Sequence, residues 1–92
     1  MPRPRRRCRV RGKPSSDYFK PAGVPLRLLK SSELTIPEFE AVRLNDCNRI
    51  EQEEAAIEMQ ISQPTFSRIL TSARRKISDA LVNGKAIKIN KY

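Results

Sequence analysis

The feature that most constrains this chain is a pair of helical patterns separated by only two residues, Gln60 and Ile61. The first pattern covers residues 51–59, and its apolar face consists of Ala55, Ala56 and Met59. The second begins at Ser62, a favoured N-cap, and continues for about 20 residues to Asn83-Gly84. Its apolar residues recur three or four positions apart: Phe66, Ile69, Leu70, Ala73, Ile77, Ala80 and Leu81. Helices joined this closely must meet at an angle and bury their apolar faces inside it.

This pattern predicts a helix-turn-helix whose second helix enters the major groove of DNA. Ala56 supplies the small residue that the close approach of the two helices requires. Gln60 occupies the turn position where glycine is usual, so the turn needs a left-handed non-glycine residue, at a cost of about 1 kcal/mol. An alternative is a small helical bundle without DNA, but such a bundle has no need for a polar, basic face directly after the turn.

The predicted DNA contacts lie on the second helix. Glutamine can read adenine, arginine can read guanine or a phosphate, and serine and threonine bond to either. A helix N-terminus also suits a phosphate. Base or nearby phosphate contacts are therefore predicted for Ser62, Gln63, Thr65, Ser67, Arg68, Thr71 and Ser72. Phosphate contacts are predicted further along the helix for Arg74, Arg75 and Lys76.

Charge is segregated along the chain, which carries 19 Lys and Arg against 10 Asp and Glu, for a net +9. Residues 1–13 hold seven bases and no acid, residues 33–59 hold eight acids and two bases, and residues 60–92 hold seven bases and one acid. This distribution indicates a polyanion on one side of the protein, whereas the alternative is a solvated surface with a disordered tail. Residues 1–14 are predicted to be a flexible arm that contacts phosphates or a minor groove through Arg3, Arg5, Arg6, Arg7 and Arg9.

The remaining segments predict further elements around the helix pair. Residues 15–32 read as an extended segment that packs its aromatic residues on the domain, with a short strand near Tyr18. A capping box of Thr35 and Glu38 predicts another helix, ending near Asp46. The tail alternates like a strand that pairs with the Tyr18 region or with a second subunit. The fold class predicted is therefore mainly α, a three-helix helix-turn-helix domain at 33–92 with a long third helix and a short C-terminal strand.

Several functional classes are disfavoured by what the sequence lacks. It has no histidine, and Cys8 and Cys47 alone cannot form a zinc site, so we expect neither an enzyme nor a metal or other cofactor. Cys47 reads as a small core residue. Cys8 lies among arginines that favour its thiolate, which makes it only a weak redox or metal candidate. With no long apolar run and no signal-peptide pattern, a cytoplasmic protein without a membrane partner is expected.

Residues 33–83 resemble region four of the primary-type sigma factors, which reads the −35 promoter element. The chain is also similar, over nearly its whole length, to an uncharacterised family of small bacterial and archaeal proteins predicted to bind DNA through the same kind of helix-turn-helix. The stretches that carry this resemblance are MPRPRRRCR, YFKPAGVPLR, LTIPEFEAVRL, QEEAA, SQPTF and RILTSARRKISDALVNGKAIKI. The turn glycine is replaced by Gln60, and a cysteine frequent shortly after Cys8 is missing.

Together these features predict a DNA-binding protein that regulates transcription. Its expected partners are double-stranded DNA and RNA polymerase, the latter through the acidic helices. A homodimer is also expected, because the apolar stripe through Ile77 and Leu81 must be covered by a second chain or by the YFKPAGVPLRLL segment. The alternatives are a protein-interaction module and an RNA-binding protein that uses the arginine-rich arm.

Overall fold

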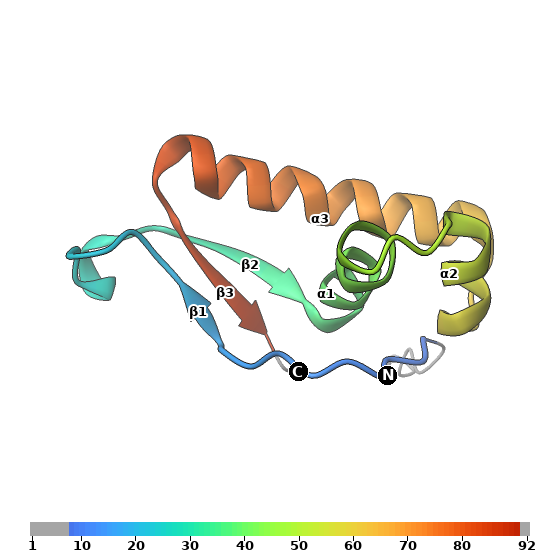
Figure 1. Cartoon of the computed structure of the whole chain (residues 1–92). Helices are drawn as coiled ribbons and strands as arrows, with labels where there is room; N and C mark the ends of the chain where they lie inside the picture. Colours follow the sequence, from blue (N-terminus) through green and yellow to red (C-terminus); the bar gives the residue numbers. More distant parts are fainter. Residues whose placement is uncertain (1–7, 91–92) are drawn as a thin grey trace, which may run out of the picture.

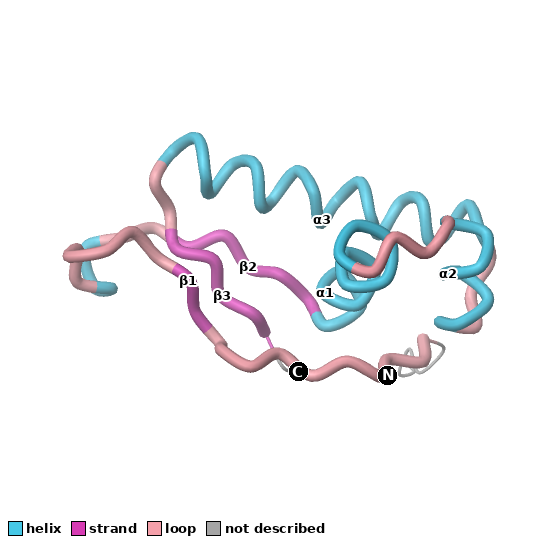
Figure 2. Tube along the Cα trace, in the orientation of Figure 1, coloured by secondary structure: helices cyan, strands magenta, loops and turns pink. Residues whose placement is uncertain are grey.

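The computed structural model describes residues 8–90. Within them, helix α3 (Gln63–Asn83) runs along one side of the molecule, as Figure 1 shows. A small sheet lies beneath one half of α3, and helices α1 (Ile36–Ala41) and α2 (Gln52–Met59) lie beneath the other half. Figure 2 makes this separation of strands and helices visible along the Cα trace. No helix in residues 8–90 is long and apolar enough to cross a membrane.

The sheet joins parts of the chain that are far apart in the sequence. Its central strand β3 (Ala86–Asn90) pairs antiparallel with β1 (Tyr18–Phe19) and parallel with β2 (Ser31–Thr35). The C-terminal strand and its pairing with the Tyr18 region are therefore confirmed. Strand β2 was not predicted, because its sequence, SSELT, has a single large apolar residue. The fold is thus three helices with a three-stranded sheet rather than helices with one short strand.

Helix α1 begins as the capping box predicted. The Glu38 backbone N–H donates to Thr35 Oγ1 (3.2 Å), and the Thr35 backbone N–H donates to Glu38 Oε1 (2.8 Å). The helix continues as a π-helical segment, η2 (Val42–Cys47), so the predicted end near Asp46 is confirmed. Cys47 is exposed, and its expected place in the core is wrong. A π turn holds more residues than an α turn, so the side chains after it no longer follow the α-helical stripe.

Two connected clusters form the core. The first lies inside the angle between α2 and α3, and its large members are Leu44, Met59, Phe66 and Leu70. The second joins α3 to the sheet through Leu34, Ala73 and Ile89. Ile77 packs against this second cluster, so the sheet covers that part of the apolar stripe. Leu81 is 76% exposed, so the described residues leave this end of the apolar stripe uncovered.

The segment before β2 departs from its expected packing. Phe19 is 54% exposed and Tyr18 is 38% exposed, so the aromatic residues lie on the surface of the sheet rather than in the core. Lys88 contributes a cation–π contact with Tyr18, its Nζ lying 6.0 Å from the ring centroid. A 3-10 turn, η1 (Leu26–Leu28), then leads into β2.

Candidate functional site

The turn between α2 and α3 is the first component of the candidate site. Gln60 adopts a left-handed conformation (φ 60°), as its place in the turn predicted. Its backbone N–H donates to Ile57 O (3.0 Å), and the Ile61 N–H donates to Ala56 O (3.1 Å). These bonds use carbonyls at the end of α2 that have no partner within the helix. The turn is therefore closed by backbone bonds without a glycine.

Helix α3 starts immediately after this turn. Ser62 caps it, its Oγ accepting a hydrogen bond from the Thr65 N–H (3.2 Å) and donating one to Thr65 Oγ1 (2.9 Å). Phe66, which is fully buried, lies one turn further along and holds the helix against α2. The cap and this apolar anchor together set where the first turns of α3 project.

A polar surface lies on the side of α3 that faces away from the core. We call it the outer face of α3. Its residues are all exposed: Gln63, Ser67, Arg68, Thr71 and Arg75. A shallow hollow of about 390 Å³ lies over its middle, lined by Ser67, Arg68, Thr71, Ser72 and Arg75. Within residues 8–90, Arg68 makes no ion pair, so its guanidinium is directed at solvent. This face can present donors and acceptors to a ligand without breaking contacts of the fold.

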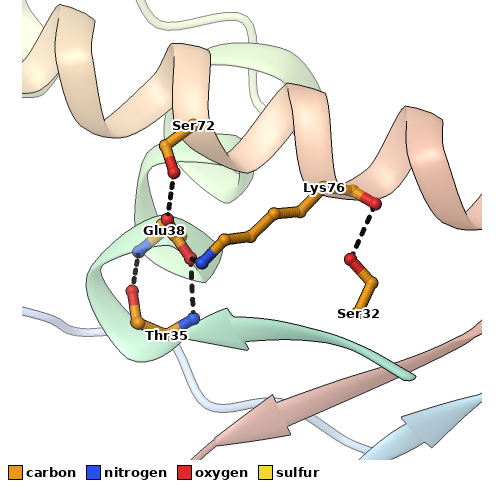
Figure 3. A network of polar contacts seen from close by, with 5 residues as sticks. All are labelled: Ser32, Thr35, Glu38, Ser72 and Lys76. Carbon is orange, nitrogen blue, oxygen red and sulfur yellow. Dashed lines mark hydrogen bonds and ion pairs between the residues drawn. The ribbon is translucent and has the colours of Figure 1, made fainter. Parts of the chain in front are cut away.

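Three of the predicted contact residues are engaged inside the protein instead. Arg74 forms an ion pair with Asp46 (Nη2 to Oδ1, 2.6 Å) and also donates to Asn45 Oδ1 (3.0 Å). Lys76 and Ser72 both bond to Glu38, as Figure 3 shows. The side chains of these three residues are therefore engaged within the protein and are not free to bind a ligand at the outer face of α3.

Glu38 is the centre of the contacts between α1 and α3. Its side chain accepts from Ser72 Oγ (2.6 Å), Lys76 Nζ (2.9 Å) and the Thr35 N–H (2.8 Å), the three dashed contacts at Glu38 in Figure 3. Only 7% of Glu38 is exposed. Burial alone would raise the pKa of this carboxyl, but the hydrogen bonds and the Lys76 charge outweigh it and hold the pKa below its ordinary value of 4.5.

Glu40 has a similar role on another face of α1. It is 2% exposed and forms a bidentate pair with Arg43, with both nitrogen–oxygen distances 2.8 Å. Its two oxygens also accept from the backbone N–H groups of Arg11 and Gly12, each at 3.2 Å. Burial opposes ionisation, but these bonds prevail and lower the pKa of Glu40 from its ordinary value. From the sequence, Glu38 was assigned only to the capping box, and Glu40 was given no role in the contacts between elements.

Acid should weaken the fold through these two carboxyls. Because their pKa values are lower in the folded protein than in the unfolded chain, they stabilise the fold above about pH 4.5. That stabilisation is lost as the pH falls through the folded-state pKa values. We expect the double variant Glu38→Gln/Glu40→Gln to lose less free energy of unfolding than the wild type as the pH falls from 6 to 3, as measured by urea titration at each pH. Ser32→Ala breaks only the bond from Ser32 Oγ to the Lys76 carbonyl and should keep the wild-type slope; equal slopes for all three proteins would contradict the assignment.

Part of the N-terminal arm lies on the domain. Residues 8–14 lie alongside α1 and the end of α2. The Arg9 backbone N–H donates to the Met59 carbonyl oxygen (2.8 Å). The backbone donors of these residues find acceptors at Met59 and Glu40. Four of the predicted arm contacts fall outside the described residues: Arg3, Arg5, Arg6 and Arg7. Arg9 is exposed.

Comparison with known proteins places the chain among close relatives. The family model described as "Protein of unknown function DUF134" matches residues 1–91. A UPF0251 protein of Caldanaerobacter subterraneus is 56% identical over 89 residues, which cover 97% of this chain and 75% of the relative. One from Thermoanaerobacter is 54% identical over 90 residues (97% and 79%), and one from Dehalococcoides mccartyi is 51% identical over 89 residues (97% and 76%). No solved structure matches the chain. With a family model that spans nearly its whole length and relatives above half identity, this chain belongs to the DUF134 (UPF0251) family.

Proposed function

We propose that this protein binds double-stranded DNA and regulates transcription, with α2, the Gln60 turn and α3 acting as a helix-turn-helix. The observation that carries the proposal is the outer face of α3. It places an exposed glutamine, hydroxyl groups and two arginines on the first four turns of a helix that follows a tight turn. These are the side chains that hydrogen-bond base edges and phosphates in a major groove.

The neighbouring contacts support a rigid presentation of this face. The two helices share the buried side chains of Met59, Phe66 and Leu70, so their relative angle is held by packing. Glu38 ties α3 to α1 from the other side through Ser72 and Lys76. A recognition surface gains affinity from such preorganisation, because less conformational freedom is lost on binding.

Within the proposed surface the residues have different roles. Gln63, Ser67 and Arg68 lie on the first turns, where a helix in the groove meets base edges, and we assign base contacts to them. Arg75 lies two turns further along and is exposed, and we assign it a phosphate contact. Arg74 and Lys76 keep their ion pairs with Asp46 and Glu38 and support the helix instead.

A homodimer is also part of the proposal. Leu81 and Val82 are 76% and 81% exposed at the end of α3, and Leu81 borders a hollow of about 260 Å³ that Phe19 also lines. Exposed apolar residues grouped in this way favour a protein contact. Pairing there would put two outer faces of α3 on one assembly, as palindromic DNA sites require.

Arg68→Ala tests the base-reading role. Loss of a base contact should weaken binding to a duplex enriched by selection from random sequences by about 10- to 100-fold. Binding to unselected duplexes should change by only about twofold, because it depends on total charge. Fluorescence anisotropy at two salt concentrations measures both. Arg27→Ala, which removes an exposed arginine before β2, is the matched control and should leave the ratio unchanged.

Two results would count against the proposal. Equal losses on selected and unselected duplexes would remove the base-reading role of Arg68. Failure of the selection to enrich any motif would remove sequence-specific recognition altogether and would favour the protein-interaction or RNA-binding alternative.

A further inference from the structure

A second cationic surface lies on the N-terminal segment 8–14, which we call the docked segment. Its side chains alternate strictly between two environments. Cys8, Val10, Gly12 and Pro14 are half-buried against the protein, whereas Arg9, Arg11 and Lys13 are exposed. This is the period of an extended chain, in which alternate side chains on one side lie about 7 Å apart. Every residue that faces solvent in this segment is therefore a cation.

The backbone of the docked segment is held at three places. Cys8 packs against the core cluster inside the angle of α2 and α3. The Arg9 N–H bonds to Met59 O, and the N–H groups of Arg11 and Gly12 bond to the buried carboxylate of Glu40. A Cβ at position 12 would lie 2.2 Å from Arg43 Nε, so glycine allows this close approach. The Cys8 side chain and the backbone N–H groups make these attachments, which leaves the three cationic side chains to face solvent.

The docked segment and the outer face of α3 lie on opposite sides of the molecule. In Figures 1 and 2, the N-terminal segment runs along the edge opposite α3, with α1 and the sheet between them. The buried residues Phe66, Leu70 and Ala73 turn one face of α3 toward that interior, so its outer face points away from it. A straight duplex against the outer face of α3 is therefore separated from the docked segment by the body of the protein.

We propose that the docked segment is a second phosphate-binding surface, through which one molecule holds a second duplex beside the one bound by α3. The inference rests on the proposed function. Evenly spaced cations on an extended backbone suit the repeating phosphates of DNA and carry no base-reading geometry, so this contact is independent of sequence. The buried acid that holds the segment does not cancel its charge, because Glu40 is paired with Arg43.

A capture experiment tests this surface. One duplex is fixed to beads through biotin, the full-length protein is added, and retention of a second, fluorescent duplex is measured. Arg9→Gln/Arg11→Gln removes two charges from the docked segment. The control Arg27→Gln/Lys30→Gln removes two exposed charges elsewhere, near the 3-10 turn. We expect the first variant to retain at least tenfold less of the second duplex, and the control to retain as much as the wild type. Affinity for a single duplex should be equal in the two variants.

The salt dependence gives an independent measure. With two fewer phosphate contacts, the Arg9→Gln/Arg11→Gln variant should show a slope of log binding constant against log salt concentration that is shallower by about 1.8. The ratio of wild-type to variant capture should therefore fall about tenfold between 50 and 200 mM salt. Equal capture by the two variants would overturn the inference and would point to bridging by a dimer through two α3 faces. Single-duplex binding without any capture by the wild type would also overturn it, while leaving the proposed function intact. If the wild-type protein did not bind even a single duplex, the proposed function would be contradicted.

Discussion

Glu38→Ala is expected to lower the free energy of unfolding by about 3 kcal/mol, because it removes one partner from a buried, ion-paired network. The substitution leaves Lys76 without its carboxylate, Ser72 without its acceptor, and the Thr35 N–H without its capping partner. It also removes the polar contacts that join α1 to α3 beside their apolar packing. For a domain of this size, the loss corresponds to a melting temperature roughly 12 to 20 °C lower.

Urea unfolding at pH 7, followed by circular dichroism, measures the effect. Glu33→Ala is the matched control: it removes an exposed glutamate from β2 and should change stability by less than about 0.5 kcal/mol. Glu38→Gln keeps one oxygen that can accept from the Thr35 N–H and places an NH2 group that can donate to Ser72 Oγ, but it lacks the charge opposite Lys76; its stability should fall between those of the two alanine variants. A loss below about 1 kcal/mol for Glu38→Ala would show that the α1–α3 contact does not depend on this carboxylate.

Glu40→Ala is expected to cost about 3 kcal/mol as well, with an additional local effect on the docked segment. The variant removes the acceptor for the Arg11 and Gly12 backbone and leaves Arg43 unpaired. The segment should then detach before the rest of the protein unfolds. Among the described residues, the hydrogen bond from the Arg9 N–H to the Met59 carbonyl would be its remaining backbone hydrogen bond to the domain. Trypsin cleavage after Arg9 and Arg11 should become at least tenfold faster under native conditions.

The control for this experiment is Glu53→Ala, which removes an exposed acid from α2 and should change neither stability nor cleavage. Cleavage after Arg68 provides an internal reference, because this bond lies inside α3 and is cleaved only when the core helix opens. If Glu40→Ala accelerated cleavage equally at Arg11 and Arg68, the carboxylate would stabilise the whole domain without specifically holding the N-terminal segment.

Local patterns predicted the helical half of the fold well. The capping box at Thr35, the cap at Ser62, the left-handed Gln60 and the end of α3 at Gly84 each depend on a few neighbouring residues. Such interactions are decided within one or two turns, so they can be read from consecutive residues. The C-terminal strand was also predictable, because its apolar residues alternate over a short stretch.

Non-local pairing was not predictable in the same way. Strand β2 owes its conformation to the register with β3, in which Ser31 lies opposite Ala86 and Thr35 opposite Asn90. The contacts of the docked segment could not be predicted for the same reason, although Val10 and Gly12 alternate with cations in the sequence. The acceptors that hold the segment lie at Glu40 and Met59, far along the chain.

The candidate site also has features that local sequence patterns predicted and features that depend on tertiary packing. By itself, the sequence determined that a capped helix with a polar, basic face follows a tight turn, because helical periodicity assigns Gln63, Ser67, Arg68 and Thr71 to positions outside the apolar stripe. Only the tertiary structure decided which charges remain exposed. Asp46 and Glu38 come from α1 and its π-helical extension, and they pair with Arg74 and Lys76 more than 25 residues away. Ion pairs between distant elements depend on how helices pack, and packing is not encoded in any local pattern of charges.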